Sequence, residues 1–229
     1  NMNHGQNYLE QEIVEQDLPF LAVPTTAGTG SEATRFAVIY YQGEKQSVSH
    51  PSCIPEYVLL DGGFLDTLPL YQKKVTMLDA FCHAIESFWS VNSTDESKAY
   101  AGKAIKLLLE YKDQYLENDR YGNEQMLLAA NMAGKAINIT QTTAGHAMAY
   151  KLTSLYGLPH GHAAGLCVSV IWPFMAAHPE KCTDPRGLIY LLDVFAEIAK
   201  AMDCDTVEAS ICRFHEMLKE LEITAPVIR

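Results

Sequence analysis

The stretch that decides the fold is residues 68–91, LPLYQKKVTMLDAFCHAIESFWSV. Its apolar residues recur at helical spacing, so the sequence predicts a helix over 68–90. Asp79 and His83 lie four residues apart in this pattern, which places both side chains on one face of the helix. A buried carboxylate beside a buried imidazole is costly unless something compensates both groups. A metal ion is one such compensator.

Two further histidines belong to segment 142–165, TTAGHAMAYKLTSLYGLPHGHAAG. We expect His146 inside a helix of small residues and His160 in the loop that follows that helix. One carboxylate and three neutral imidazoles leave a divalent ion one net positive charge, which suits Fe(II), Zn(II) or a similar metal with an open position for substrate. Any one of these histidines alone is more simply an ordinary core or surface residue, whereas the four residues together favour a metal site.

Composition limits the class of protein. A chain of 229 residues with 48% hydrophobic content can bury a substantial core. The net charge of −11 argues against nucleic-acid binding, because phosphates require a basic face. The sequence shows no apolar run of membrane-spanning length and no secretory signal, and its six cysteines occur without a CxxC pair. We therefore expect a cytoplasmic protein that does not bind membranes.

The order of elements predicts a mainly α protein with a β-containing beginning. Short strands are expected at 18–23, 35–41 and 56–61, the first of them buried, with a hairpin turn and further extended chain over 43–55. After residue 66 the pattern is helical throughout, which predicts a β-containing part, 1–66, and an all-helical domain, 67–229. The expected helices are 68–90, 97–116, 123–139, 143–156, 162–177, 186–202 and 206–221.

Segment 24–32, PTTAGTGSE, is rich in glycines and hydroxyl side chains. Backbone N–H groups in such a loop can approach a phosphate or ribose closely. Gly28, Gly30 and Ala33 match a GxGxxA pattern, but a dinucleotide fingerprint should open a helix, and residues 35–41 are strand-like instead. Taken alone, the segment is equally well explained as a tight turn between two strands.

Three segments together resemble the iron-containing (group III) alcohol dehydrogenases, which share the fold of dehydroquinate synthase and glycerol dehydrogenase. They are PTTAGTGSE at 24–32, LDAFCHAIE at 78–86 and GHAMAYKLTSLYGLPHG at 145–161, and they occur in the family's order. The resemblance extends over residues 19–178, which is most of the chain. It implies the helical metal-binding domain of the dehydroquinate synthase-like fold, preceded by a short β-containing remnant of the α/β cofactor domain.

The resemblance also implies a set of functional residues. The metal ligands would be Asp79, His83, His146 and His160, which favours His160 over its neighbour His162. The nicotinamide cofactor, NAD or NADP, would contact Thr25, Thr26, Thr29, Val38 and Lys45. Tyr150 stands where many members have a histidine, four residues after the ligand His146. Tyr150 or His162 could move a proton, and simple packing is the alternative for Tyr150.

The sequence contains no GGGS-type loop for a pyrophosphate, so the chain is expected to be a fragment that binds NAD(P) only weakly on its own. The residues AMAYKLTSLYG and PHGHA resemble a branch that reduces phosphonoacetaldehyde, which makes a phosphonate one candidate substrate. Arg35 and Arg186 are far apart in sequence and do not suggest an obvious phosphonate clamp. A homodimer is expected.

The expected reaction is hydride transfer between NAD(P)(H) and a small alcohol or aldehyde, with Fe(II) or Zn(II) acting as a Lewis acid on the substrate oxygen. Two alternatives stay open. One is a metal-dependent lyase or cyclase of the dehydroquinate synthase type, and the other is an inactive metal-binding helical module that serves only assembly. The AGTGSE loop and the set of one aspartate and three histidines favour the dehydrogenase.

Overall fold

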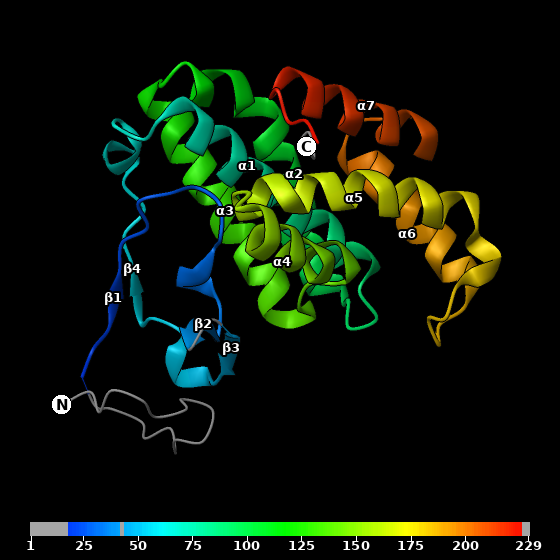
Figure 1. Cartoon of the computed structure of the whole chain (residues 1–229), viewed down its shortest axis with the longest axis horizontal. Helices are drawn as coiled ribbons and strands as arrows, with labels where there is room; N and C mark the ends of the chain where they lie inside the picture. Colours follow the sequence, from blue (N-terminus) through cyan, green and yellow to red (C-terminus); the bar gives the residue numbers. More distant parts are fainter. Residues whose placement is uncertain (1–17, 42–43, 226–229) are drawn as a thin grey trace.

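The computed structural model describes residues 18–41 and 44–225, which are mainly helical (Figure 1). This confirms the predicted fold class. None of the helices in these two ranges is long and apolar enough to cross a membrane. The α-helices, close to their predicted positions, are α1 Leu70–Trp89, α2 Asp95–Leu116, α3 Arg120–Thr140, α4 Ala144–Tyr156, α5 His160–Ala177, α6 Leu188–Ala201 and α7 Val207–Glu220.

Helix α1 lies at the centre of the helical body. Every residue from Met77 to Trp89 is buried, because α1 packs against α2, α3, α5 and α6. A helix that is enclosed on all sides can be apolar around its whole circumference, and any charged group on it must find a partner inside the protein. Asp79, His83 and Glu86 are such groups. The centre of the fold therefore contains charged groups that must have partners inside the protein.

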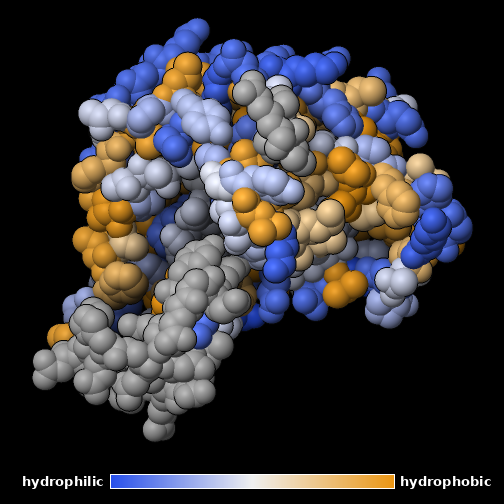
Figure 2. Space-filling model, viewed as in Figure 1, coloured by the Kyte–Doolittle hydropathy of each residue, from blue (hydrophilic) through white to orange (hydrophobic). Residues whose placement is uncertain are grey.

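The strands form two small sheets beside the helices (Figure 1). Strands β1 Leu21–Ala22 and β4 Tyr57–Val58 pair in parallel, whereas β2 Phe36–Tyr41 and β3 Glu44–Ser49 form an antiparallel hairpin. The predicted buried strand at 18–23 is wrong in length and in burial, since β1 has two residues and Leu21 is 55% exposed. Figure 2 shows hydrophobic residues gathered on the surface over β1 and β4.

The loop after β1 leads into a short 3-10 helix, η2 Ser31–Ala33, that packs on α3. Gly30 adopts a left-handed conformation with φ 58°, and a Cβ at this position would lie 2.6 Å from Ala130 O. Glycine therefore lets the loop lie directly on the α3 backbone. Since β2 follows η2, the loop does not open an α-helix, as a dinucleotide fingerprint would.

The change from strands to helices occurs between β4 and α1, through the 3-10 helix η4 Gly62–Leu65. This transition lies near the predicted boundary at residue 66. The division of the chain into two domains, 1–66 and 67–229, stays a prediction.

Candidate metal centre

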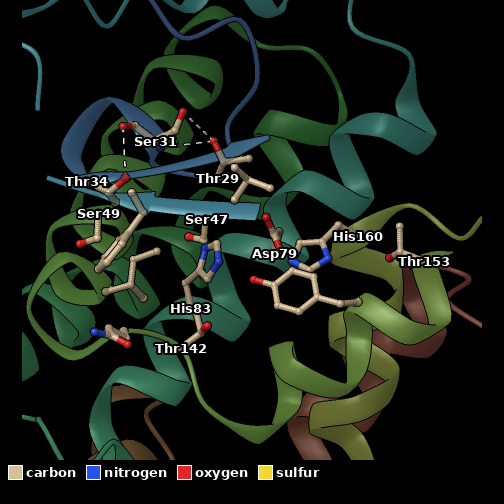
Figure 3. Close-up of a pocket in the computed structure, with 15 residues that line it drawn as sticks. Thr29, Ser31, Thr34, Ser47, Ser49, Asp79, His83, Thr142, Thr153 and His160 are labelled. Atoms are coloured by element: carbon tan, nitrogen blue, oxygen red, sulfur yellow. Dashed lines mark hydrogen bonds between the residues drawn. The ribbon is translucent and has the colours of Figure 1, made fainter. Parts of the chain in front are cut away.

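Three of the predicted ligands meet between three helices. Asp79 on α1, His146 on α4 and His160 on α5 each offer one ligand atom, and these atoms all lie within 4.8 Å of one another. Asp79 and His146 are buried, while His160 is half-buried. Figure 3 shows Asp79 and His160 next to each other at one side of a cavity. The fold thus brings together residues that are up to 81 positions apart in the sequence.

A close contact between α1 and α5 makes this meeting possible. His160 is the first residue of α5, with Pro159 as N-cap, so the expectation that His160 lies in the preceding loop is wrong. The next residue, Gly161, lies against α1, where a Cβ would be 2.8 Å from Asp79 Cβ and closer still to Val75 O. Any side chain at residue 161 would push α5 away from α1. The glycine therefore keeps His160 beside Asp79.

Several polar atoms of the cluster are buried without a hydrogen bond. Among the described residues, Asp79 Oδ1, His83 Nδ1 and His146 Nε2 have no hydrogen-bond partner. His146 Nε2 and Asp79 Oδ1 lie 3.4 Å apart, within the distance of an ion pair. Orphaned buried polar atoms are rare and costly in native proteins. A cation bound between a carboxylate oxygen and imidazole nitrogens would satisfy them, and this set of donors suits Fe(II) or Zn(II). The residues present therefore fit a metal ion.

His83 lies beside the cluster but is not part of it. Its ring stacks on that of His146, with ring centroids 4.4 Å apart and planes 14° apart. It also lines the same cavity as Asp79 and His160 (Figure 3). The role of His83 as a fourth ligand stays a prediction.

The electrostatics of the cluster place a proton on one particular histidine. Burial would raise the pKa of Asp79, but the imidazoles of His83, His146 and His160 outweigh burial and lower it. Burial would lower the pKa of His146, but Glu86 and Asp79 outweigh burial and raise this pKa to about 9. For His83 burial dominates, and its pKa falls to about 4 in spite of Asp79. Without a metal, His146 is therefore protonated at neutral pH and His83 is neutral.

The cavity next to the cluster has a volume of about 480 Å³. Seven serine and threonine side chains line it, together with Tyr150 and apolar residues of the hairpin. We call the five that precede α1 in the chain the hydroxyl wall. In Figure 3, Thr34 and Ser49 lie on the side of the cavity away from His160. The hydroxyl wall consists of Thr29, Ser31, Thr34, Ser47 and Ser49.

Of the predicted cofactor residues, Thr29 and Val38 line this cavity, whereas Thr25 and Thr26 do not. The side chain of Lys45 lies outside the described part of the structure. Sequence reasoning missed Ser47 and Ser49, although a signal was available. In the hairpin, Val38 pairs with Ser47, so a predicted register would have placed Ser47 and Ser49 beside Val38.

The two candidates for proton transfer have different surroundings. Tyr150 lines the cavity, and its ring stacks on that of His160 with centroids 4.9 Å apart. His162 does not line the cavity. Its Nδ1 is hydrogen-bonded with the Tyr71 hydroxyl at 2.9 Å, and its Nε2 with Thr224 O at 2.8 Å. His162 thus connects the start of α5 to α1 and to the end of the described chain.

A residue that the sequence did not mark as functional, Glu86, contacts the cluster from behind. It is completely buried, and its Oε2 is in direct contact with His146 Nδ1. The available signal was its position seven residues after Asp79, on the same buried stripe of α1. A buried acid two turns from a candidate ligand is well placed to orient a second ligand.

The two arginines considered for an anion clamp lie elsewhere. The Arg186 guanidinium donates to both carboxylate oxygens of Asp184, at 2.6 and 2.9 Å, and to Ser90 O at 2.7 Å. Arg35 lies over the ring of Phe36, 5.3 Å from its centroid. Neither arginine lines the cavity.

Comparisons with known proteins bear directly on this site. The profile of the "Fe-containing alcohol dehydrogenase family, C-terminal" matches residues 73–227, and that of "Iron-containing alcohol dehydrogenase" matches residues 2–62. A phosphonoacetaldehyde reductase from Streptomyces viridochromogenes is 34% identical over 196 residues, which are 83% of this chain and 50% of that protein.

Two solved structures have a similar fold. The iron containing alcohol dehydrogenase from Thermococcus thioreducens superposes with a TM-score of 0.84 at 25% identity, over 93% of this chain and 54% of that one. The sulfoacetaldehyde reductase from Bifidobacterium kashiwanohense, in complex with NAD+, gives a TM-score of 0.82 at 25% identity, over 96% of this chain and 56% of that one. The chain thus spans about half the length of the relatives it matches.

Proposed function

Because the chain belongs to the iron-containing alcohol dehydrogenase family, we propose that it provides the metal site of an oxidoreductase that transfers a hydride between NAD(P)(H) and a small alcohol or aldehyde. The observation that carries this proposal is the cluster of Asp79, His146 and His160 beside the cavity. The orphaned atoms of this cluster need a partner, and the cavity leaves room for a substrate next to it.

In this proposal Asp79, His146 and His160 hold Fe(II) or Zn(II), and His83 is the fourth ligand. When bound, the ion would supply Lewis-acid polarisation of the substrate oxygen. Asp79 sets the net charge of the site, and the histidines direct neutral nitrogen atoms toward it. Burial of Asp79 and His146 excludes water from their side of the site.

Tyr150 is the residue proposed to move the proton. Reduction of an aldehyde requires a proton on the oxygen that becomes the alcohol, and oxidation releases one. The Tyr150 hydroxyl can donate and accept a proton, and its ring is held on His160 at the edge of the cavity. Proton transfer by His162 would require it to give up the Tyr71 or Thr224 hydrogen bond. We therefore propose a positioning role for His162.

The hydroxyl wall is proposed to hold the nicotinamide end of the cofactor and the polar end of the substrate. Its hydroxyls can donate to or accept from an amide or a ribose. Thr29 and Val38 keep their proposed cofactor contacts because they line this cavity. Contacts of the cofactor with Thr25, Thr26 and Lys45 remain part of the proposal. The NAD+ complex of the structurally similar sulfoacetaldehyde reductase supports the choice of cofactor class.

The proposed substrate is a short aldehyde that carries an acidic group, such as a phosphonate. Two similar proteins are named reductases of phosphonoacetaldehyde and of sulfoacetaldehyde. The residues that line the cavity within the described chain include no lysine or arginine. Hydroxyls such as those of Ser47 and Ser49 can nevertheless donate hydrogen bonds to an oxyanion. In this proposal they, and not Arg35 or Arg186, receive the acidic group.

Metal content tests the proposal. The chain would be purified without oxygen in the presence of Fe(II) or Zn(II) and examined by elemental analysis, and NADH and NADPH binding would be measured by calorimetry. We expect about one ion per chain in the wild type and none in His146→Ala or His160→Ala. His178→Ala is the matched control, because its side chain is 44% exposed and its contacts, with Glu180 across 3.3 Å and with the Phe174 ring, lie outside the cluster. Stoichiometric metal in both ligand variants would exclude the proposed site.

A further inference from the structure

Glu86 of α1 supplies the hydrogen-bond acceptor at the start of α4. Its Oε1 accepts from the N–H of Thr143 at 3.2 Å, the N–H of Gly145 at 2.9 Å and the Thr143 hydroxyl at 2.5 Å. Thr143 is the N-cap residue of α4, but its own side chain does not cap the helix. The first N–H groups of a helix need an acceptor, and a negative charge is favourable there. Glu86 meets both needs from another helix.

The Thr143 hydroxyl also contacts Trp89. Its indole Nε1–H can only donate, and it donates to Thr143 Oγ1 at 2.9 Å. The Thr143 hydroxyl donates its own proton to Glu86 Oε1, because a carboxylate oxygen only accepts. Four donors converge on Oε1, the fourth being the N–H of His146 at 3.4 Å, and a carboxylate oxygen can act only as an acceptor. A Cβ at Gly145 would lie 2.9 Å from Oε1, so glycine lets the backbone N–H come this close.

The other oxygen of Glu86 faces His146. Oε2 is in direct contact with His146 Nδ1, and since a carboxylate oxygen only accepts, Nδ1 must carry a proton and donate it. A neutral imidazole with its proton on Nδ1 has its lone pair on Nε2. This Nε2 is the atom that lies 3.4 Å from Asp79 Oδ1. The carboxylate behind the ring thus selects the tautomer that can bind a metal.

We propose that Glu86 is a positioning residue that keeps the Nε2 lone pair of His146 directed toward Asp79 and ties this orientation to the start of α4. The inference rests on the metal site of the proposed function. Carboxylates that accept from the second nitrogen of a histidine ligand fix its tautomer and orientation in many metal sites. Here the same carboxylate also caps the helix that carries the histidine, so the ring and the helix are held together.

The substitution Glu86→Gln changes the preferred tautomer of His146 while keeping the size and shape of the side chain at residue 86. Glutamine has nearly the same size, but one of its two end groups is an NH₂ that donates. The four donors at the Oε1 position require the amide oxygen there, so the NH₂ must face His146 Nδ1. Nδ1 then accepts, and the neutral ring carries its proton on Nε2, where the proton prevents ligation. The variant should fold and yet bind metal poorly.

The matched control is Glu32→Gln. Glu32 is also buried, and its Oε1 accepts from Asn131 Nδ2 at 3.0 Å, but it lines a different cavity, bounded by α2 and α3. We would measure Zn²⁺ affinity by calorimetry and the visible spectrum of the Co²⁺-loaded chain. We expect Zn²⁺ binding about 10- to 100-fold weaker in Glu86→Gln, the usual effect of removing such an orienting group. We also expect an altered Co²⁺ spectrum, and wild-type behaviour from Glu32→Gln.

Wild-type Zn²⁺ affinity and an unchanged Co²⁺ spectrum in Glu86→Gln would overturn the inference, even if the variant were less stable. Helix capping alone would lower stability without changing the spectrum. If Glu86→Gln does not fold, Thr143→Val decides, because it removes one donor from Oε1 while Thr143→Ser keeps it. Weaker Zn²⁺ binding in the valine variant alone supports the inference, and unchanged binding overturns it. A wild-type chain that takes up no Zn²⁺, or a His146→Ala variant that retains it, would remove the proposed site together with this inference.

Discussion

Replacing Gly161 by alanine tests whether the contact between α1 and α5 sets the spacing of the candidate ligands. In this variant the new methyl group would lie 2.8 Å from Asp79 Cβ and closer to Val75 O, which is a backbone atom and cannot turn aside. Overpacking of this kind costs about 1–3 kcal/mol of folding free energy. The two helices must separate to relieve the contact, and Asp79 and His160 separate with them.

Gly102 of α2 provides the matched control. A Cβ at Gly102 would meet only Phe88 Cζ, at 3.7 Å, which is an ordinary van der Waals distance. Gly102→Ala should therefore stabilise the chain by about 0.5–1 kcal/mol, because alanine loses less entropy than glycine on forming a helix. Both variants replace a helical glycine by alanine, so the difference between their free energies of unfolding reports mainly the cost of the α1–α5 contact. The gain from alanine is smaller at Gly161, because this residue lies near the start of α5.

Thermal unfolding followed by circular dichroism would measure this difference. For a chain of this size 1 kcal/mol corresponds to about 2–4 °C in Tm, so Gly161→Ala should melt about 2–12 °C below Gly102→Ala. Metal sites tolerate only about 0.2 Å of error in ligand distance, so Zn²⁺ affinity should also fall by at least about tenfold in Gly161→Ala alone. Equal Tm and equal Zn²⁺ affinity in the two variants would refute the argument that Gly161 sets the ligand spacing.

Three further predictions follow from the same structure. With the pKa of His146 at about 9 in the metal-free chain, a metal must displace its proton, so Zn²⁺ affinity should rise with pH up to about 9. Calorimetry across that range measures the affinity, and an affinity that does not change with pH would contradict this prediction. Lys73→Met should cost about 2–4 kcal/mol in urea unfolding, because it removes the donor from two buried acceptors, Tyr115 O and Asn123 Oδ1. Lys74→Met, whose partner Glu222 is 80% exposed, should cost at most about 1 kcal/mol, and equal losses in the two variants would contradict this. Tyr150→Phe should lower aldehyde reduction by about 10²- to 10⁴-fold with Zn²⁺ affinity unchanged, and an unaltered rate would leave Tyr150 with packing only.

The helices could be predicted from sequence because their signals are local. Residues 70–89 repeat apolar side chains at helical spacing, and glycines and prolines separate the later helices. The start of α5 was missed by two residues because Gly161 resembles a helix breaker. In the structure Pro159, with φ −53°, precedes a regular helix, and Gly161 serves the approach to α1. The sequence shows that a glycine is present, but not which neighbour requires it.

The burial of β1 could not be predicted for a different reason. Its apolar residues resemble those of a buried strand, yet Leu21 and Tyr57 are 55% and 61% exposed. Parallel strands are normally covered on both faces, and the described part of the chain does not cover this pair. Burial depends on what packs against a strand, which a strand's own sequence does not contain.

For the candidate metal site, too, the local part could be predicted from the sequence and the long-range part could not. Asp79 and His83 are four residues apart on one helix, so their common face could be read directly from the sequence. The structure nevertheless groups Asp79 with His146 and His160, while His83 stacks on His146. Helical spacing determines the face on which a side chain lies, but packing against neighbouring helices determines its rotamer. The candidate ligands on α4 and α5 each lie beside a contact with α1, one through Glu86 and one through Gly161. We predict that a change at either contact disturbs the candidate site without touching a ligand.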